Sequence, residues 1–211
     1  MLDDRIRSVL ERLEREDADE RDAGLPIAQR SRAVEPTSGR FLFALVAPQT
    51  DCEVLEIGGS RGYSTIWLAA GVRYLGGRVL SLEHDPRKIE AWRRNIADAG
   101  LEDWAELVEG DARETIPTLE GPFGLVFVDG TKVEYREYLE LAEPKLAERA
   151  MLVVDNLLMS GEVGLPEGAD TFWSPENLAS ARALNTELVN SDDWVACVLP
   201  VGDGIVVAAR R

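Results

Sequence analysis

The stretch Val54-Leu55-Glu56-Ile57-Gly58-Gly59-Ser60-Arg61-Gly62-Tyr63-Ser64-Thr65 determines the fold that we expect. Residues 54–57 are short, mainly apolar and β-prone, which predicts a buried strand that ends in a turn. Three glycines free the backbone at that turn, and apolar residues at helical spacing follow over 63–70. The order is therefore strand, glycine loop and helix, which leaves backbone N–H groups and a helix N-terminus facing one small ligand.

The glycine loop has the spacing Glu56-x-Gly58-x-x-x-Gly62, which differs from the dinucleotide pattern G-x-G-x-x-G. An acid at the strand end disfavours a pyrophosphate and favours a cationic ligand. S-adenosylmethionine is such a ligand, because it carries an ammonium and a sulfonium group. The stretch resembles motif I of the class I S-adenosylmethionine-dependent methyltransferases, although an ordinary strand-to-helix turn would also account for the glycines.

The composition indicates one acidic domain. The chain has 211 residues, 45% of them hydrophobic, and contains no apolar run of the roughly 18 residues that span a membrane. The charged N-terminus lacks a secretory signal and two cysteines are too few for a disulfide framework or a zinc site, so we expect a cytoplasmic protein with no membrane partner. A net charge of −16 argues against a nucleic-acid partner, since phosphate binding draws on Lys and Arg.

Helices and strands alternate along the chain. Residues 3–16 predict an amphipathic helix and 17–22 a charge-rich break, so we place an N-terminal helical extension at 1–35 and a methyltransferase domain at 36–211. The expected strands are 52–57, 78–82, 105–108, 124–128, 151–154, 194–199 and 204–209. The expected helices are 36–46, 63–72, 86–99, a short one after 111, 134–148 and 175–190. This α/β order predicts a Rossmann-like, doubly wound, mostly parallel seven-stranded sheet, with one antiparallel strand from the closing hairpin.

An acid ends the second expected strand. Glu83 lies 21 residues after Gly62, and an acid at about that spacing accepts hydrogen bonds from ribose hydroxyls in nucleotide-binding folds. Asp85 before Pro86 suits a helix N-cap, which leaves Glu83 to be explained by a ligand. His84 is the single histidine, and its position favours a contact near the adenosine over general-base chemistry.

Another acid ends the third expected strand. Asp111, followed by Ala112, can be a plain N-cap for the short helix after it. The likeness to class I methyltransferases implies instead that this position approaches the adenine. The two interpretations are compatible, and both stay open.

Polar residues also end the fourth and fifth strands. Asp129 follows the strand 125–128, and Asp155 and Asn156 follow the strand 151–154. Consecutive strands of a βαβ unit tend to be neighbours, so these side chains should lie roughly 5–10 Å apart. Two carboxylates and one amide oxygen form a hard, all-oxygen site that suits Mg²⁺.

These strand ends belong to a longer resemblance. The segments 129–132, 135, 138–139, 153–157, 161 and 199–204 resemble the cation-dependent O-methyltransferases, which include catechol and caffeoyl-CoA O-methyltransferase. The likeness covers roughly residues 36–209. It implies metal ligation by Asp129, Asp155 and Asn156, and a general base at Lys132. With the strand-end positions it implies cofactor binding by Glu56, Gly58, Gly59, Ser64, Glu83, His84, Asp111, Ala112 and Asp129.

The chain departs from that family at three places. Gly130 stands where many members have Ala or His, and Met159 where many have an aromatic residue. Residues 160–174 match no family pattern, although this loop should border the acceptor pocket and contains Phe172 and Trp173. The identity of the acceptor is therefore less determined than the reaction.

The leading hypothesis is an enzyme that transfers a methyl group from S-adenosylmethionine to a hydroxyl of a small, catechol-like aromatic acceptor. A divalent cation such as Mg²⁺ would chelate two vicinal oxygens, and Lys132 would remove the proton. The alternatives are a tRNA-modifying methyltransferase of the same family, a nicotinamide-dependent oxidoreductase and an inactive S-adenosylmethionine-binding protein. By analogy with bacterial relatives we expect a homodimer.

Overall fold

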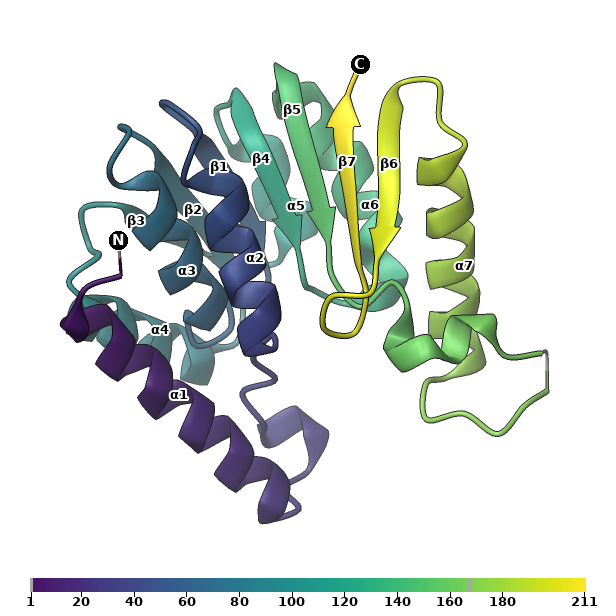
Figure 1. Ribbon diagram of the computed structural model, residues 1–211, viewed down its shortest axis with the longest axis horizontal. Coiled ribbons are helices and arrows are strands. Elements are labelled where there is room, and N and C mark those ends of the chain that lie inside the picture. The colour runs from purple at the N-terminus through teal and green to yellow at the C-terminus, as the bar shows by residue number, and fades with distance from the viewer. Residues whose placement is uncertain (1, 167) are drawn as a thin grey trace.

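A computed structural model describes residues 2–166 and 168–211, and one twisted seven-stranded sheet runs through the described part (Figure 1). The strands are β1 (Glu53–Ile57), β2 (Arg78–Glu83), β3 (Ala105–Glu109), β4 (Phe123–Val128), β5 (Leu146–Val154), β6 (Trp194–Leu199) and β7 (Ile205–Arg210). Their order in the sheet is β3-β2-β1-β4-β5-β7-β6. Within this sheet β7 alone runs opposite to the other strands and pairs antiparallel with β5 and β6, which confirms the expected doubly wound arrangement with one antiparallel strand.

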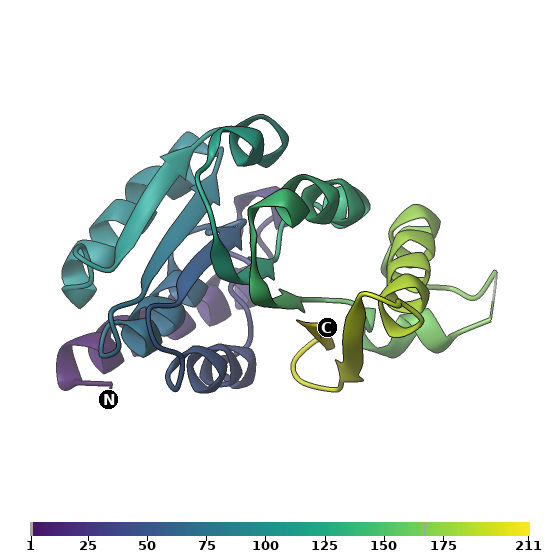
Figure 2. The same ribbon diagram turned by 90° about the horizontal axis from the view of Figure 1, so that it is seen from above.

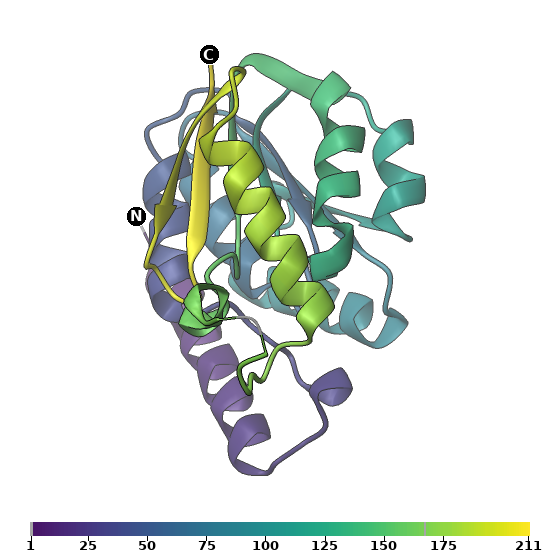
Figure 3. The ribbon, with the colours of Figure 1, turned by 90° about the vertical axis from the view of Figure 1, so that its right-hand side faces the viewer.

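Helices cover both faces of the sheet (Figures 2 and 3). They are α1 (Asp4–Asp22), α2 (Pro36–Val46), α3 (Tyr63–Val72), α4 (Pro86–Ala99), α5 (Ala112–Thr115), α6 (Tyr135–Ala142) and α7 (Pro175–Val189). Short 3₁₀ turns are η1 (Ile27–Gln29), η2 (Ile116–Thr118), η3 (Lys132–Glu134), η4 (Glu143–Lys145) and η5 (Met159–Gly164). One apolar core joins the sheet to α2, α3 and α4, with α1 packed outside them, and a second core joins it to α6 and α7. Among the described residues no helix has the length and apolar character needed to cross a membrane.

The helix α1 is longer than the sequence suggested. The expected break at 17–22 is wrong, because the helix continues to Asp22. Asp17 pairs with Arg21 one turn later and is itself buried, with 4% of its surface exposed. The residues after the helix, 23–35, run across the carboxyl ends of the strands toward α2, and we call this segment the strap.

Two further boundaries differ from expectation. The helix expected over 134–148 ends as α6 at Ala142 and gives way to the 3₁₀ turn η4, which contains Pro144. Proline lacks the N–H that would continue the helical hydrogen bonding. The strand β5 therefore begins at Leu146, earlier than the expected residue 151, and ends at Val154 as expected.

Candidate active site

Three adjoining cavities lie where the strand ends, the glycine loop and the strap meet. Cavity A, of about 240 Å³, is lined by Gly58, Glu83, His84, Asp111 and Ala112 among others. Cavity B, of about 20 Å³, is lined by Gly58, Gly59, Ser64 and strap residues. Cavity C, of about 460 Å³, is lined by Asp155, Asn156, Lys132, Phe172 and Trp173 among others. Asp129 and Arg32 line all three, so the cavities form one connected site.

The glycine loop brings the end of β1 close to the end of β4. Gly58 has a φ of +97°, and a Cβ atom there would lie 2.5 Å from the carbonyl oxygen of Asp129. Only glycine permits this approach, which sets Asp129 directly beside the loop. Gly62, with a φ of 89°, then precedes the first turn of α3, as the strand, loop and helix order predicts.

Glu83 faces cavity A and its orientation is fixed by the backbone. Its carboxylate accepts hydrogen bonds from the N–H groups of Ser60 at 2.9 Å, His84 at 2.8 Å and Asp85 at 2.9 Å. Asp85 caps α4 through the N–H of Arg87, as expected. The acid proposed for ribose thus holds the glycine loop against the end of β2.

Asp111 has both of the features that its sequence position allowed. Its side chain accepts from the N–H of Arg113 at the start of α5 and also lines cavity A, as does Ala112. The Arg113 guanidinium beside it lowers the pKa of Asp111 to about 2. The carboxylate is therefore ionised at neutral pH and available to the cavity.

Glu56 lies behind the glycine loop and lines none of the three cavities. It is fully buried, and its carboxylate accepts from the hydroxyls of Ser64 at 2.6 Å, Ser81 at 2.6 Å and Thr65. Burial raises the pKa of Glu56. The predicted cofactor acid thus organises the interior beneath the loop, while Ser64 also reaches cavity B. A direct contact between Glu56 and the cofactor stays a prediction.

The three predicted metal ligands meet in cavity C. Asp129 and Asp155 follow neighbouring strands whose last residues, Val128 and Val154, are register partners. Asp155 is 4% exposed, and its Oδ1 has no hydrogen-bond partner among the described residues. Burial and the Asp129 carboxylate raise the pKa of Asp155. The strand ends therefore bring together oxygen atoms that the chain itself leaves partly unpaired.

Asn156 is oriented by a residue that sequence reasoning did not assign. Its amide Nδ2 donates to Oδ2 of Asp203 at 3.1 Å, and Ser160 donates to the other carboxylate oxygen at 2.7 Å. Among the described residues nothing donates to the amide oxygen of Asn156, which is therefore left for a ligand. Asp203 lies in the turn before β7, and an acid between two glycines of a hairpin turn was the available signal.

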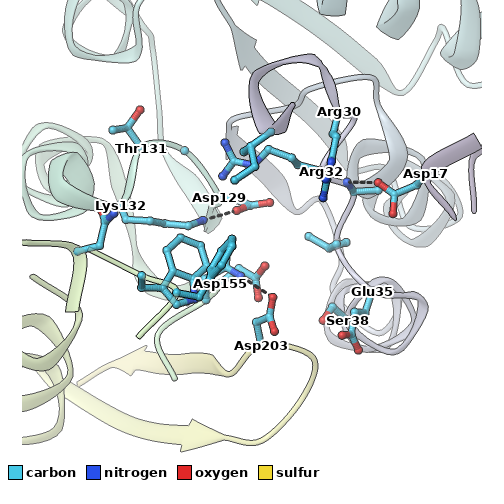
Figure 4. Close-up of a pocket in the computed structure, with 18 of the residues that line it drawn as sticks. Asp17, Arg30, Arg32, Glu35, Ser38, Asp129, Thr131, Lys132, Asp155 and Asp203 are labelled. Carbon is cyan, nitrogen blue, oxygen red and sulfur yellow. Dashed lines mark hydrogen bonds and ion pairs between the residues drawn. The ribbon is translucent and has the colours of Figure 1, made fainter. Parts of the chain in front are cut away.

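Lys132 is buried at the edge of cavity C and points toward Asp129 (Figure 4). Its Nζ donates to Oδ1 of Asp129 at 2.7 Å and to the hydroxyl of Tyr135 at 2.6 Å. Tyr135 is fully buried, and this burial together with Asp129 raises its pKa well above the usual value. The amine is thus held in one place beside the oxygen-rich strand ends.

The candidate metal set is small. No group of three or more His, Cys, Asp or Glu side chains in the described ranges is arranged to hold a metal ion. Asp129, Asp155 and Asn156 instead provide two carboxylates and one amide. A buried carboxylate oxygen without a donor costs free energy, which a cation would offset. The unpartnered Oδ1 of Asp155 therefore fits a hard divalent cation such as Mg²⁺.

The strap was missed by sequence reasoning. Every polar group of Ser31 is bonded: its N–H donates to Glu20 at 2.6 Å, its hydroxyl donates to Asp17 at 2.5 Å, and its carbonyl accepts from the Ser60 hydroxyl at 2.8 Å. The strap is thus fixed between α1 and the glycine loop. A signal was present in the sequence, because Asp17 follows Leu13 by four residues and so lies on the same face of α1 as its buried apolar residues.

The loop after β5 forms the outer wall of cavity C. Phe172 and Trp173 line the cavity, and their rings pack edge to face at 5.7 Å. Glu162 accepts hydrogen bonds from the N–H groups of both residues at 3.1 Å. Phe172 is 73% exposed, so this aromatic pair is available to cover a ligand.

Comparisons with known proteins first define the class. A family described as "Methyltransferase domain" matches residues 55–157. The crystal structure of an O-methyltransferase from Bacillus cereus in complex with SAH (S-adenosylhomocysteine) has a TM-score of 0.79 and 30% identity, and the match covers 97% of this chain and 91% of that one. The fold is therefore that of the S-adenosylmethionine-dependent methyltransferases.

Two curated relatives narrow the family. The chain is 42% identical over 153 residues to a catechol O-methyltransferase of Mycobacterium tuberculosis, covering 72% of this chain and 67% of that protein. It is 34% identical to a catechol O-methyltransferase of Niastella koreensis, covering 67% of this chain and 64% of that protein. The match thus spans about two thirds of both relatives. The chain belongs to the S-adenosylmethionine-dependent O-methyltransferases, as the resemblance in its sequence implied.

Proposed function

We propose that this protein transfers a methyl group to a hydroxyl of a small, catechol-like aromatic acceptor with the help of a divalent cation. One observation carries the proposal: Asp129, Lys132 and Asp155 converge in cavity C, where a buried oxygen of Asp155 has no donor among the described residues. The names of the two catechol O-methyltransferases support the same substrate class.

The cofactor would occupy cavities A and B. In this arrangement Glu83 binds the ribose hydroxyls, and Asp111 and Ala112 border the adenine. Asp129 borders all three cavities, so the methyl donor and the acceptor would meet beside it. Holding both reactants in line supplies much of the rate acceleration in such a transfer.

The acceptor would lie in cavity C. A divalent cation held by Asp129, Asp155 and Asn156 would lower the pKa of the hydroxyl that it contacts. Lys132 accepts the hydroxyl proton at Nζ, and Asp129 and Tyr135 keep that amine in position. Trp173 covers the aromatic ring of the acceptor from the loop side.

A methyl-transfer screen tests this function. Catechols, flavonoids, hydroxycinnamoyl thioesters and tRNA would be offered with Mg²⁺ or with EDTA. We expect catechol methylation that EDTA abolishes and that Mg²⁺ restores. Asp155→Ala should be inactive with normal binding of S-adenosylhomocysteine, and Asp192→Ala, at an exposed position outside the three cavities, should be fully active.

Other results would contradict the proposal. Methylation of tRNA and of none of the small acceptors would support a tRNA-modifying methyltransferase instead. The net charge of −16 disfavours this alternative. Turnover that persists in EDTA would show that the reaction does not require a divalent cation. We also propose a cytoplasmic homodimer with a helical extension over 1–35, and sedimentation analysis measures its oligomeric state.

A further inference from the structure

Arginines of the strap line cavity C. Arg30 and Arg32 reach it from the side opposite Lys132 (Figure 4), and Arg32 also borders cavities A and B. The placement is notable in a chain with a net charge of −16. The cavity thus has carboxylates at the strand ends, and on the strap side it has arginines beside the carboxylates of Asp17 and Glu35.

The guanidinium of Arg32 is not directly bonded to the described part of the protein. No hydrogen bond or ion pair of its side chain occurs among the described residues, and the residue is exposed to the cavities. The other arginines at this wall are engaged, since Arg21 pairs with Asp17 and Nε of Arg30 donates to the carbonyl of Leu25 at 2.6 Å. Arg32 therefore presents five unpaired donors to a ligand.

The backbone of Arg32 is held in place rather than free. Its φ of 55° lies in the left-handed region, which a residue with a side chain adopts at a cost. Ser31 before it makes the three hydrogen bonds described above, and the N–H of Ala33 after it donates to Asp17 at 3.3 Å. Both flanking residues thus fix the point from which this arginine reaches the cavities.

We propose that the acceptor carries a carboxylate and that Arg32 is the specificity-determining residue that binds it. The inference rests on the proposed function: the reacting hydroxyls would lie at Lys132 and the strand ends, and the carboxylate at the opposite wall. Arginine suits this role because its planar fork matches a carboxylate with two parallel hydrogen bonds. A cavity of about 460 Å³ has room for one aromatic ring with a short acidic substituent.

The cofactor also has a carboxylate, but cavity B offers that group a different site. Ser64 and Tyr63, in the first turn of α3, line cavity B, where N-terminal N–H groups favour an anion. In cavity C the lysine is already bonded to Asp129 and Tyr135, and Arg30 to the carbonyl of Leu25, so Arg32 is the cation left for a ligand. The acceptor is therefore the better source of the carboxylate.

Binding measurements on the intact protein test this assignment. The dissociation constants of 3,4-dihydroxybenzoate, its methyl ester and 3,4-dihydroxybenzylamine would be measured by calorimetry with saturating S-adenosylhomocysteine and Mg²⁺. We expect the acid to bind tighter than the ester and the amine weakest. Arg32→Gln should weaken the acid at least about tenfold and leave the ester within about twofold. Arg32→Lys should recover part of the loss, and Arg149→Gln, an exposed residue outside the cavities, should change neither.

Several other results would overturn the inference. Equal affinity for acid and ester, equal losses for both in Arg32→Gln, or no binding of either would show that no carboxylate is recognised. Weaker binding of S-adenosylhomocysteine, but not of 5′-methylthioadenosine, by Arg32→Gln would assign the arginine to the carboxylate of the cofactor. Arg32-dependent binding of the acid without methyl transfer would uphold the inference and contradict only the proposed function.

Discussion

The two halves of the site differ in how their charges are satisfied. Beneath cavities A and B, Glu56 accepts from three hydroxyls and Glu83 from three backbone N–H groups. At cavity C, an oxygen of Asp155 and the guanidinium of Arg32 have no partner within the described residues. The two buried carboxylates of the cofactor half are hydrogen-bonded within the protein, whereas cavity C has polar groups left for ligands.

This difference separates two kinds of contribution. The carboxylates of Glu56 and Glu83, which are hydrogen-bonded within the protein, hold the glycine loop and β2 in position. Substitutions of these residues should therefore change the affinity for the cofactor. A buried polar atom without a partner, such as Oδ1 of Asp155, raises the free energy of the folded protein until a ligand pairs it. Changes at cavity C should therefore act on turnover and acceptor choice while leaving cofactor affinity alone. Three substitutions test this separation.

Lys132→Met should have the largest effect. We expect kcat to fall by roughly 10²–10⁴-fold, the usual contribution of a general base, with unchanged affinity for S-adenosylhomocysteine in calorimetry. The matched control is Lys145→Met, which removes hydrogen bonds to the carbonyls of Pro117 and Leu119 away from the cavities. That control should lower the melting temperature and leave kcat unchanged.

The pH dependence of Lys132→Met sharpens the result. Raising the pH should restore part of the lost rate, because the acceptor hydroxyl then ionises without a base. A normal kcat at neutral pH would instead show that the hydroxyl loses its proton without Lys132, and the role of this residue would be reduced to pairing with Asp129.

Glu83→Ala should have an intermediate effect on the other half of the site. Loss of a charge-assisted hydrogen bond to ribose should weaken S-adenosylhomocysteine binding by about 1.5–3 kcal/mol, or roughly 10–150-fold. Glu109→Ala, at the exposed end of β3 and outside the three cavities, is the control. Unchanged affinity for S-adenosylhomocysteine with a raised acceptor KM would contradict the division into a cofactor half and an acceptor half. Thermal unfolding would report any loss of folded protein.

Trp173→Ala should have the smallest effect. We expect the acceptor KM to rise about two- to tenfold, because aromatic contacts contribute modestly beyond their buried area. The affinity for S-adenosylhomocysteine should stay constant, and Leu165→Ala, in the same loop but outside the cavities, should change neither value. If Trp173→Ala lowers only the melting temperature, the loop is a surface insertion fastened by its aromatic pair.

Local signals in the sequence predicted the framework of the site. The strand, glycine loop and helix at 54–65 follow from residue spacing, and Asp129 and Asp155 follow from their positions at strand ends. The environment of Glu56 could not be predicted, because its partner Ser81 lies on a different strand, and only the register of β1 with β2 brings the two together.

The strap escaped prediction for a related physical reason. A run of charged residues at 17–22 looks like a solvated break, and only packing shows that Asp17 is buried and bonded. Nothing in the spacing around Arg32 distinguishes it from other arginines in the chain. Such residues acquire a role through contacts distant in sequence, which a pattern of nearby residues does not contain.

The hydrogen bonds of Ser31 bear on how this protein can be divided or recombined. This one residue joins α1, through Asp17 and Glu20, to the glycine loop, through Ser60. A chimera joined at residue 36, with the N-terminal part from one relative and the sheet from another, would separate these partners. It would also mismatch a wall shared by all three cavities. The helix α1, the strap and the glycine loop are therefore joined by hydrogen bonds, and we expect substrate range to pass between relatives when the three are exchanged together.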